Sequence, residues 1–137
     1  MEKTAEPRRL HRHVGSAPPS PWVRRFAHLI PEAGRVLDLA CGGGRHARHL
    51  LSLGYRVVCI DRTTEPVADL EDEPNVEIIE ADLESAGPWP PWPLAGRLFA
   101  GVVVTNYLYR PLFPHILDAI QPGGVLIYET FASGNEA

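Results

Sequence analysis

A glycine-rich turn with an acidic residue just ahead of it is the part of this sequence best suited to hold a ligand. The stretch VLDLACGGGRHA, residues 36–47, has the pattern of a buried strand, then a turn, then the start of a helix. Turns of this kind commonly bind phosphates, because the N-terminus of a helix presents free N–H groups and a partial positive charge. Asp38 would repel a phosphate at that place. The charge of the ligand is therefore the first question.

Further polar residues stand directly after apolar runs elsewhere in the chain: Asp61, Asp82 and Asn106. In an open parallel sheet, ligands bind beyond the carboxyl ends of the strands, at the point where the strand order reverses. The glycine turn and these residues all follow predicted strands. We therefore expect them to surround one candidate site.

A dinucleotide is one candidate ligand. Gly42, Gly44 and Ala47 match the relaxed pattern G-x-G-x-x-G/A. Asp61 ends the second apolar run, where a ribose-binding acid belongs. Two observations count against this interpretation. Asp38 would oppose the pyrophosphate, and the chain leaves no sequence for the catalytic domain of a dehydrogenase.

S-adenosylmethionine fits the same turn better, because it has no phosphate and carries a sulfonium and an ammonium group. Asp38 then attracts the ligand, either directly or through water. The glycines let the backbone approach the methionine portion without a Cβ in the way. Asp61 can accept hydrogen bonds from the ribose hydroxyls, and Asp82 from the adenine amino group, with Leu83 beside the ring. The acid precedes the glycines because the ligand is positive.

Strands and helices alternate along the chain. Apolar runs predict strands at 35–39, 55–60, 76–80, 99–106 and 125–131. Helical spacing predicts helices at 21–30, 45–53 and 112–120, with a weaker helical segment at 65–71. Strands that are apolar throughout are buried on both faces, as in a parallel sheet covered by helices. The fold class is therefore α/β, a doubly wound parallel sheet.

The two least regular segments are the N-terminus and a proline-rich stretch. Residues 1–19 are a basic leader, which we interpret as a flexible terminus, and residues 20–137 form the single domain. Ser20 and Pro21 mark the start of the first helix. The stretch SAGPWPPWPLAG, residues 85–96, is too rich in proline for a helix. We interpret it as an extended connection whose tryptophans cover the sheet, with a polyproline ligand as the alternative.

Composition excludes some classes of function. The 137 residues suit one domain, and the net charge of −4 gives no reason to expect nucleic acid as a partner. No run approaches the ~18 apolar residues of a membrane span, and no signal peptide is evident, so the expected location is the cytoplasm. Cys41 and Cys59 are interpreted as reduced thiols. A catalytic Cys41 is the alternative, without an evident partner in the sequence.

Several motifs in order resemble the class I, Rossmann-like, S-adenosylmethionine-dependent methyltransferases. VLDLACGGG resembles the family's first motif, with Ala40 in place of its first glycine. CID, ending at Asp61, resembles the second motif, and ADLE at 81–84 the acid that contacts adenine. PGGVLIYETF resembles the run into the fifth strand. The resemblance spans about residues 20–135 and implies the strand order 3-2-1-4-5.

The resemblance also implies a set of cofactor contacts and a class of acceptor. VVVTNYLYRPLFP is similar to a bacterial subgroup of small-molecule-type methyltransferases, so the expected partner is a small-molecule substrate. Tyr107 and Tyr109 are the substrate candidates, and packing is the alternative role for both. The implied cofactor-binding residues are Asp38, Ala40, Cys41, Gly42, Gly44, Asp61, Arg62, Asp82, Leu83 and Asn106.

The sequence departs from the family pattern at its C-terminal end. The family fold has seven strands, whereas this sequence shows five, so the last two are missing and residues 125–131 form an exposed apolar edge. We expect either a truncated form of a longer protein or a homodimer that covers this edge. A cofactor-binding remnant without activity and an RNA-binding protein that uses the basic leader stay open as alternatives.

Three histidines could take part in metal binding or acid–base chemistry. His46 and His49 have a spacing that could hold a metal, but no third ligand is evident, and Arg45 and Arg48 flank them, so we predict a solvated basic face and no metal site. His115 could be a general base, and a surface histidine on a helix is the simpler interpretation.

Overall fold

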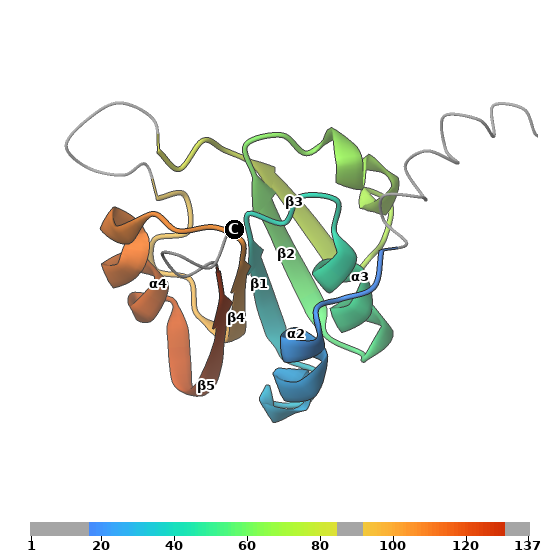
Figure 1. Ribbon diagram of the computed structural model, residues 1–137, viewed down its shortest axis with the longest axis horizontal. Helices are drawn as coiled ribbons and strands as arrows, with labels where there is room; N and C mark the ends of the chain where they lie inside the picture. Colours follow the sequence, from blue (N-terminus) through green and yellow to red (C-terminus); the bar gives the residue numbers. More distant parts are fainter. Residues whose placement is uncertain (1–16, 85–91, 131–137) are drawn as a thin grey trace, which may run out of the picture.

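The computed structural model describes residues 17–84 and 92–130, and they form one parallel sheet with helices on both faces (Figure 1). The five strands lie in the order β3-β2-β1-β4-β5, and every pairing is parallel. This confirms the predicted α/β class and strand order. The bounds of the strands are β1 Arg35–Leu39, β2 Arg56–Asp61, β3 Val76–Glu80, β4 Phe99–Thr105 and β5 Ile120–Glu129.

The helices are shorter than their apolar spacing predicts. The predicted helix 21–30 is an α-helix followed by a 3-10 turn, and the predicted helix 112–120 ends at Asp118. Ser20 caps the first helix as expected, since its hydroxyl accepts the N–H of Val23. The bounds are α2 Pro21–Phe26, η1 Ala27–Leu29, α3 Arg45–Ser52, η2 Glu65–Leu70, η3 Arg110–Leu112 and α4 Phe113–Asp118.

The start of β5 is the largest error in the predicted boundaries. The strand predicted at 125–131 begins earlier, at Ile120, so residues 122–124 lie within β5. Pro122 lacks an N–H but fits an edge strand, and Gly123 adopts a positive φ of 80°. The pairing of β4 with β5 shifts register between Phe99 and Gly101, as at a β-bulge. Proline and glycine therefore bend this strand without ending it.

Two hydrophobic clusters fill the two faces of the sheet. α2, α3 and η2 pack on one face through residues such as Val23, Leu50 and Val67. α4 packs on the other face, and Trp92 joins the cluster there. All seven residues of β4 are buried, whereas the edge strands β3 and β5 are only partly covered. Burial on both faces thus holds for the central strands. Trp92 packs as predicted, and Trp89 lies outside the described residues.

β5 forms one edge of the sheet, as expected. Beside it is a small apolar groove of about 110 Å³, lined by Phe113, Ile116, Leu117, Leu126 and Tyr128. The homodimer through this edge stays a prediction. In the described part of the chain, no helix has the length and apolar character needed to cross a bilayer.

Tyr55 connects the start of β2 to the first helical segment. Its side chain is buried, and its hydroxyl lies 3.0 Å from the carbonyl oxygen of Ala27 and 2.8 Å from that of Ile30. Tyr55→Phe removes the donor from both carbonyls. We expect a loss of about 1–2 kcal/mol in the free energy of unfolding, measured by urea denaturation. Tyr109→Phe is the control and should change it by less than about 0.5 kcal/mol. Equal effects of the two changes would contradict this role for Tyr55.

Candidate functional site

The glycine turn leaves β1 in a conformation that few residues adopt. Ala40, Gly42 and Gly44 all have positive φ, at 59°, 55° and 83°. A Cβ on Gly44 would lie 2.8 Å from a methyl group of Val67, so only glycine fits between the turn and η2. Gly44 is also the N-cap of α3. The turn therefore points its backbone away from the sheet and aims the start of α3 at the carboxyl ends of the strands.

Asp61, at the end of β2, holds the turn in place. Its Oδ2 accepts the N–H of Gly42 at 2.9 Å, and its Oδ1 accepts the N–H of Thr63 at 3.1 Å. Each carboxylate oxygen has further lone pairs for a ligand. Asp61 is therefore both a structural acceptor and a candidate ligand for paired hydroxyl groups.

Asp38 lies beneath the turn. Its side chain is 1% exposed, and it accepts a hydrogen bond from the backbone N–H of Ala47 in α3. Burial raises its pKa from 3.8 to about 7, the Ala47 N–H opposes this shift, and the charge of Asp61 adds to it. Its Oδ2 has no hydrogen-bond partner among the described residues. A buried carboxylate oxygen without a partner is stabilised by a cation above it.

Two hollows meet at the carboxyl edge of the sheet, and they share Ala40 and Asp61. The first has a volume of about 310 Å³ and the second about 430 Å³. The first hollow is lined by Ala40, Ile60, Asp61, Arg62, Ala81, Asp82, Leu83, Glu84 and Tyr107. The second hollow is lined by Ala17, Ala40, Cys41, Gly42, Gly43, Arg45, His46, Asp61, Thr105 and Asn106.

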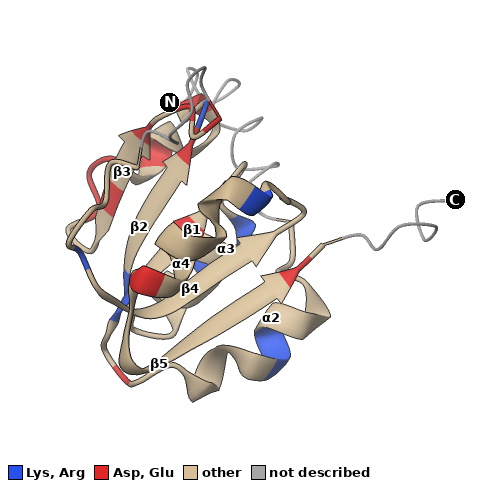
Figure 2. Cartoon of the chain, turned by 90° about the vertical axis from the view of Figure 1, so that its left-hand side faces the viewer, with Lys and Arg blue, Asp and Glu red and all other residues tan. Residues whose placement is uncertain are grey.

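The charges of the first hollow favour a neutral or cationic ligand. Asp61, Asp82 and Glu84 line it against the single base Arg62. Figure 2 shows acidic residues gathered near the ends of β2 and β3. A pyrophosphate would meet a net negative surface here. Together with the unpartnered oxygen of Asp38, this arrangement fits a sulfonium nucleoside and opposes a dinucleotide.

The structure brings most of the predicted site residues together. Of the predicted cofactor contacts, all line one of the two hollows except Asp38, which lies under the turn, and Gly44, which ends the turn as the N-cap of α3. Tyr107 lines the first hollow, and burial followed by a hydrogen bond to Glu84 raises the pKa of its hydroxyl. Tyr109 lines neither hollow and packs against the cluster beneath α4. Tyr107 packs against the same cluster, so the role of both tyrosines as substrate candidates stays a prediction.

The prediction that His46 lies on a solvated basic face is wrong. Its side chain is 2% exposed, and burial, followed by the charge of Arg45, lowers its pKa from 6.5 to about 4. Its place on the buried face of α3 with Ala47 and Leu50 follows from helical spacing, which was the available signal. Arg45 and Thr105 also line the second hollow and were not among the predicted contacts. Among the described residues, no metal-binding group of three forms.

Cys41, Cys59 and His115 are the remaining residues considered for a chemical role. Cys41 and Cys59 are both buried and form no disulfide in the structure, and their reduced state stays a prediction. A hydrogen bond with Cys59 and then burial raise the pKa of Cys41, which disfavours the nucleophilic thiolate form. His115 is half-buried and stacks on Trp92, with ring centroids 5.4 Å apart. It lines neither of the two hollows.

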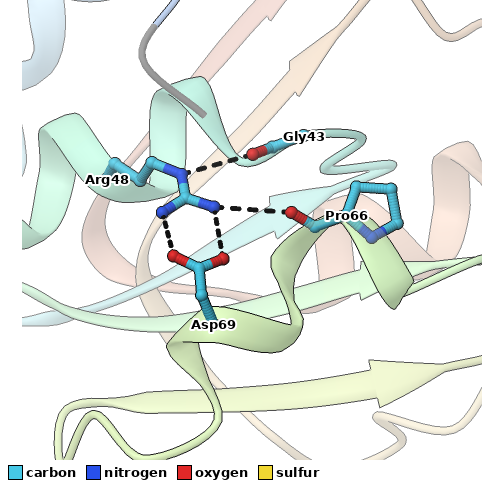
Figure 3. A network of polar contacts seen from close by, with 4 residues as sticks. All are labelled: Gly43, Arg48, Pro66 and Asp69. Atoms are coloured by element: carbon cyan, nitrogen blue, oxygen red, sulfur yellow. Dashed lines mark hydrogen bonds and ion pairs between the residues drawn. The ribbon is translucent and has the colours of Figure 1, made fainter. Parts of the chain in front are cut away.

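Arg48 fixes the back of the glycine turn (Figure 3). Its Nη1 and Nη2 bind the two carboxylate oxygens of Asp69 at 2.7 and 2.8 Å. Its Nε donates to the carbonyl of Gly43 at 3.3 Å, and its Nη2 to that of Pro66 at 3.4 Å. One guanidinium thus ties α3 to both the turn and η2, through donors that a lysine lacks.

Comparison with known proteins gives a consistent family. A family model described as a methyltransferase domain matches residues 36–124. A tRNA U34 carboxymethyltransferase of Methylococcus capsulatus is 33% identical over 132 residues, which cover 85% of this chain and 38% of that protein. The putative methyltransferase YqeM of Bacillus subtilis is 25% identical over 132 residues, which cover 88% of this chain and 51% of that protein.

Solved structures agree with the fold. The glycopeptide N-methyltransferase MtfA, complexed with S-adenosylhomocysteine, is 25% identical with a TM-score of 0.60, covering 80% of this chain and 52% of MtfA. A TehB-like S-adenosylmethionine-dependent methyltransferase from Corynebacterium glutamicum is 20% identical with a TM-score of 0.64, covering 90% of this chain and 70% of that chain. The latter likeness concerns the fold alone.

Replacing Asp38 by Asn tests the cost of the buried carboxylate. A folded pKa above the unfolded value means that the folded state favours the protonated acid, so its stability falls as the pH rises from about 4 to about 7. Relative to the wild type, Asp38→Asn should gain roughly 2–4 kcal/mol of unfolding free energy across this range. Urea denaturation at several pH values measures it. Asp72→Asn removes the same charge at an exposed position and should show no such trend. If the difference in unfolding free energy between Asp38→Asn and the wild type did not change with pH, the result would contradict the buried state of the acid.

Arg48→Lys tests the role of the guanidinium in holding the turn. Lysine keeps the charge but loses the paired contact with Asp69 and the bonds to the two carbonyls. We expect a loss of about 1 kcal/mol in the free energy of unfolding, because the ion pair is partly exposed. Arg56→Lys, on an exposed side chain at the start of β2, should leave the free energy unchanged. If both lysines had the same effect, Arg48 would be no more than a surface charge.

Proposed function

This chain belongs to the family of methyltransferase domains, and from that premise we propose that it binds S-adenosylmethionine and transfers the methyl group to a small-molecule acceptor. The observation that carries the proposal is the pair of hollows that meet at Asp61 beside the glycine turn. The first hollow suits a nucleoside, and the second hollow suits an amino acid. The chain spans 38% and 51% of the length of the two curated relatives, so the activity of the whole protein is part of the proposal.

The residues of the first hollow match the adenosine portion of the cofactor. Asp61 offers carboxylate lone pairs to the ribose hydroxyls. Asp82 accepts the N–H of Glu84 through one oxygen, and its carboxylate has further lone pairs for the adenine amino group. Ile60 and Leu83 supply the apolar surface that an aromatic base needs.

The residues of the second hollow match the methionine portion. Asp38 beneath the turn provides the negative charge that attracts the ammonium and sulfonium groups. Arg45 lines the hollow and provides a positive charge for the carboxylate. The backbone of Gly42 and Gly43 forms the floor, so the ligand can lie close to the chain.

Methyl transfer places modest demands on the protein. The bound sulfonium supplies an activated methyl group, so the reaction needs alignment and exclusion of water and no nucleophilic side chain. Asn106 lines the second hollow and Tyr107 the first, so both follow β4 beside the place where the hollows meet. We assign them to positioning the acceptor. The net charge of −4 and the acidic first hollow support a small acceptor over a nucleic acid.

Titration calorimetry with S-adenosylhomocysteine, S-adenosylmethionine and NAD tests the ligand. We expect dissociation constants between about 1 µM and about 1 mM for the first two ligands and no measurable binding of NAD. Asp61→Asn should weaken binding by about tenfold or more, because a charged acceptor for the ribose is lost. The exposed Asp72→Asn serves as the control for net charge. Tight binding of NAD without binding of S-adenosylhomocysteine would overturn the proposal.

The same titration at different pH values tests the electrostatic part. The pKa of Asp38 is about 7, so its negative charge develops as the pH rises through neutrality. We expect the affinity for S-adenosylhomocysteine to rise several-fold between about pH 6 and about pH 8. Asp38→Asn should remove most of this rise, since the amide does not titrate. An unchanged pH dependence in this variant would show that another group attracts the cation.

A further inference from the structure

The segment just before α2 is fastened to the start of α3. Residues 17–20, here called the strap, cross beside the glycine turn, and Ala17 lines the second hollow. The carbonyl of Pro18 accepts a hydrogen bond from Nη1 of Arg45 at 3.2 Å. The backbone N–H of Ser20 donates to Nε2 of His46 at 3.1 Å. Two consecutive side chains of α3 therefore bind the backbone of the strap, in a sequence region that carries no recognised cofactor motif.

The partners of His46 define its tautomer. A backbone N–H can only donate, so Nε2 accepts from Ser20 and bears no proton. The proton of the neutral ring is then on Nδ1, which lies 3.3 Å from the hydroxyl oxygen of Thr105. Thr105 ends β4 and lines the second hollow. One buried ring thus connects the strap, α3 and the end of β4.

We propose that the strap is a fixed wall of the second hollow, and that His46 is the positioning residue that holds it over the methionine portion of the cofactor. The identity of the ligand rests on the proposed function, whereas the attachment of the strap does not. A wall at this place restricts the access of water, which methyl transfer needs, and it also slows the release of the ligand.

Two conservative substitutions separate the two bonds of His46. In His46→Gln the amide lies at the reach of Nε2, so an acceptor for the Ser20 N–H is retained. In His46→Asn the amide lies at the reach of Nδ1, so only the contact with Thr105 is retained. Both replacements are neutral and polar, so a difference between them reports on the strap and not on burial of a polar group in general.

Hydrogen exchange of the ligand-free, 137-residue chain tests the attachment. We expect the exchange of the Ser20 amide to accelerate by about tenfold or more in His46→Asn and by much less in His46→Gln. Amides of the central strand β4 should keep wild-type rates in both variants, which controls for global unfolding. Equal protection of Ser20 in wild type and His46→Asn would overturn the proposal, even if the protein binds the cofactor.

Stopped-flow measurement of S-adenosylhomocysteine release tests the role of the wall. His46→Asn should release the ligand about tenfold faster than the wild type, and His46→Gln should restore most of the slow release. Ser20→Pro removes the same N–H, and its φ of −63° suits proline. The double variant with Ser20→Pro and His46→Asn should therefore release the ligand little faster than His46→Asn alone. Ser20→Ala, which keeps the N–H, should release the ligand at nearly the wild-type rate. Equal release rates in the wild type and both His46 variants would overturn the wall, and a wild type that does not bind the ligand would overturn the proposed function alone.

Discussion

The candidate site depends on one buried carboxylate. Asp38 sits at the end of the central strand β1, under the turn that leads into α3, with its side chain almost fully covered. Its hydrogen bond with the N–H of Ala47 satisfies a free donor of the first turn of α3 and places a negative charge at the positive end of the helix. One of its oxygens has no partner in the described part of the chain. The fold therefore carries a destabilising group at the place where a cationic ligand would relieve it, which is typical of functional sites.

The turn above Asp38 is held from several directions before any ligand is present. Asp61 binds it from β2, and Arg48 binds it from α3. Gly44 packs against Val67 of η2 so closely that a Cβ has no room. These contacts come from rigid elements, so the backbone N–H groups and the floor of the second hollow are preorganised. His46 extends the same arrangement to the strap, since it belongs to the helix that the turn begins.

The fold could be predicted from sequence where apolar runs end at clear boundaries. β1 and β3 have the predicted bounds because charged residues or turns follow short apolar runs directly. The predicted start of β5 was wrong because proline and glycine usually end a strand, whereas Pro122 and Gly123 are tolerated at a bulged edge. The helices were predicted too long, because apolar spacing does not distinguish an α-helix from the 3-10 turns that extend it here.

The part of the site that lies at the ends of strands could also be predicted from the sequence. Asp61, Asp82 and Asn106 follow strands directly, so the rule for parallel sheets places them without further knowledge. The prediction for His46 was wrong because a histidine among arginines suggests a solvated face, although the helical spacing with Ala47 and Leu50 places it on the buried face of α3. Tyr107 and Tyr109 both pack against the cluster that includes Ile116 of α4, but only Tyr107 also lines the first hollow.

The two hollows at the carboxyl edge of the sheet are formed by short stretches of sequence. The two hollows are formed mainly by the residues that follow β1, β2, β3 and β4, each within a few positions of a strand end. A short sequence therefore specifies the charge and the shape of this half of the site. The similar proteins include one named for tRNA and one for a glycopeptide, and the match covers 38% and 52% of their lengths. Proteins whose names carry such different substrates are therefore similar to this chain over the part that forms the two hollows. One fold can serve different acceptors, so the two hollows alone do not identify the acceptor of this chain.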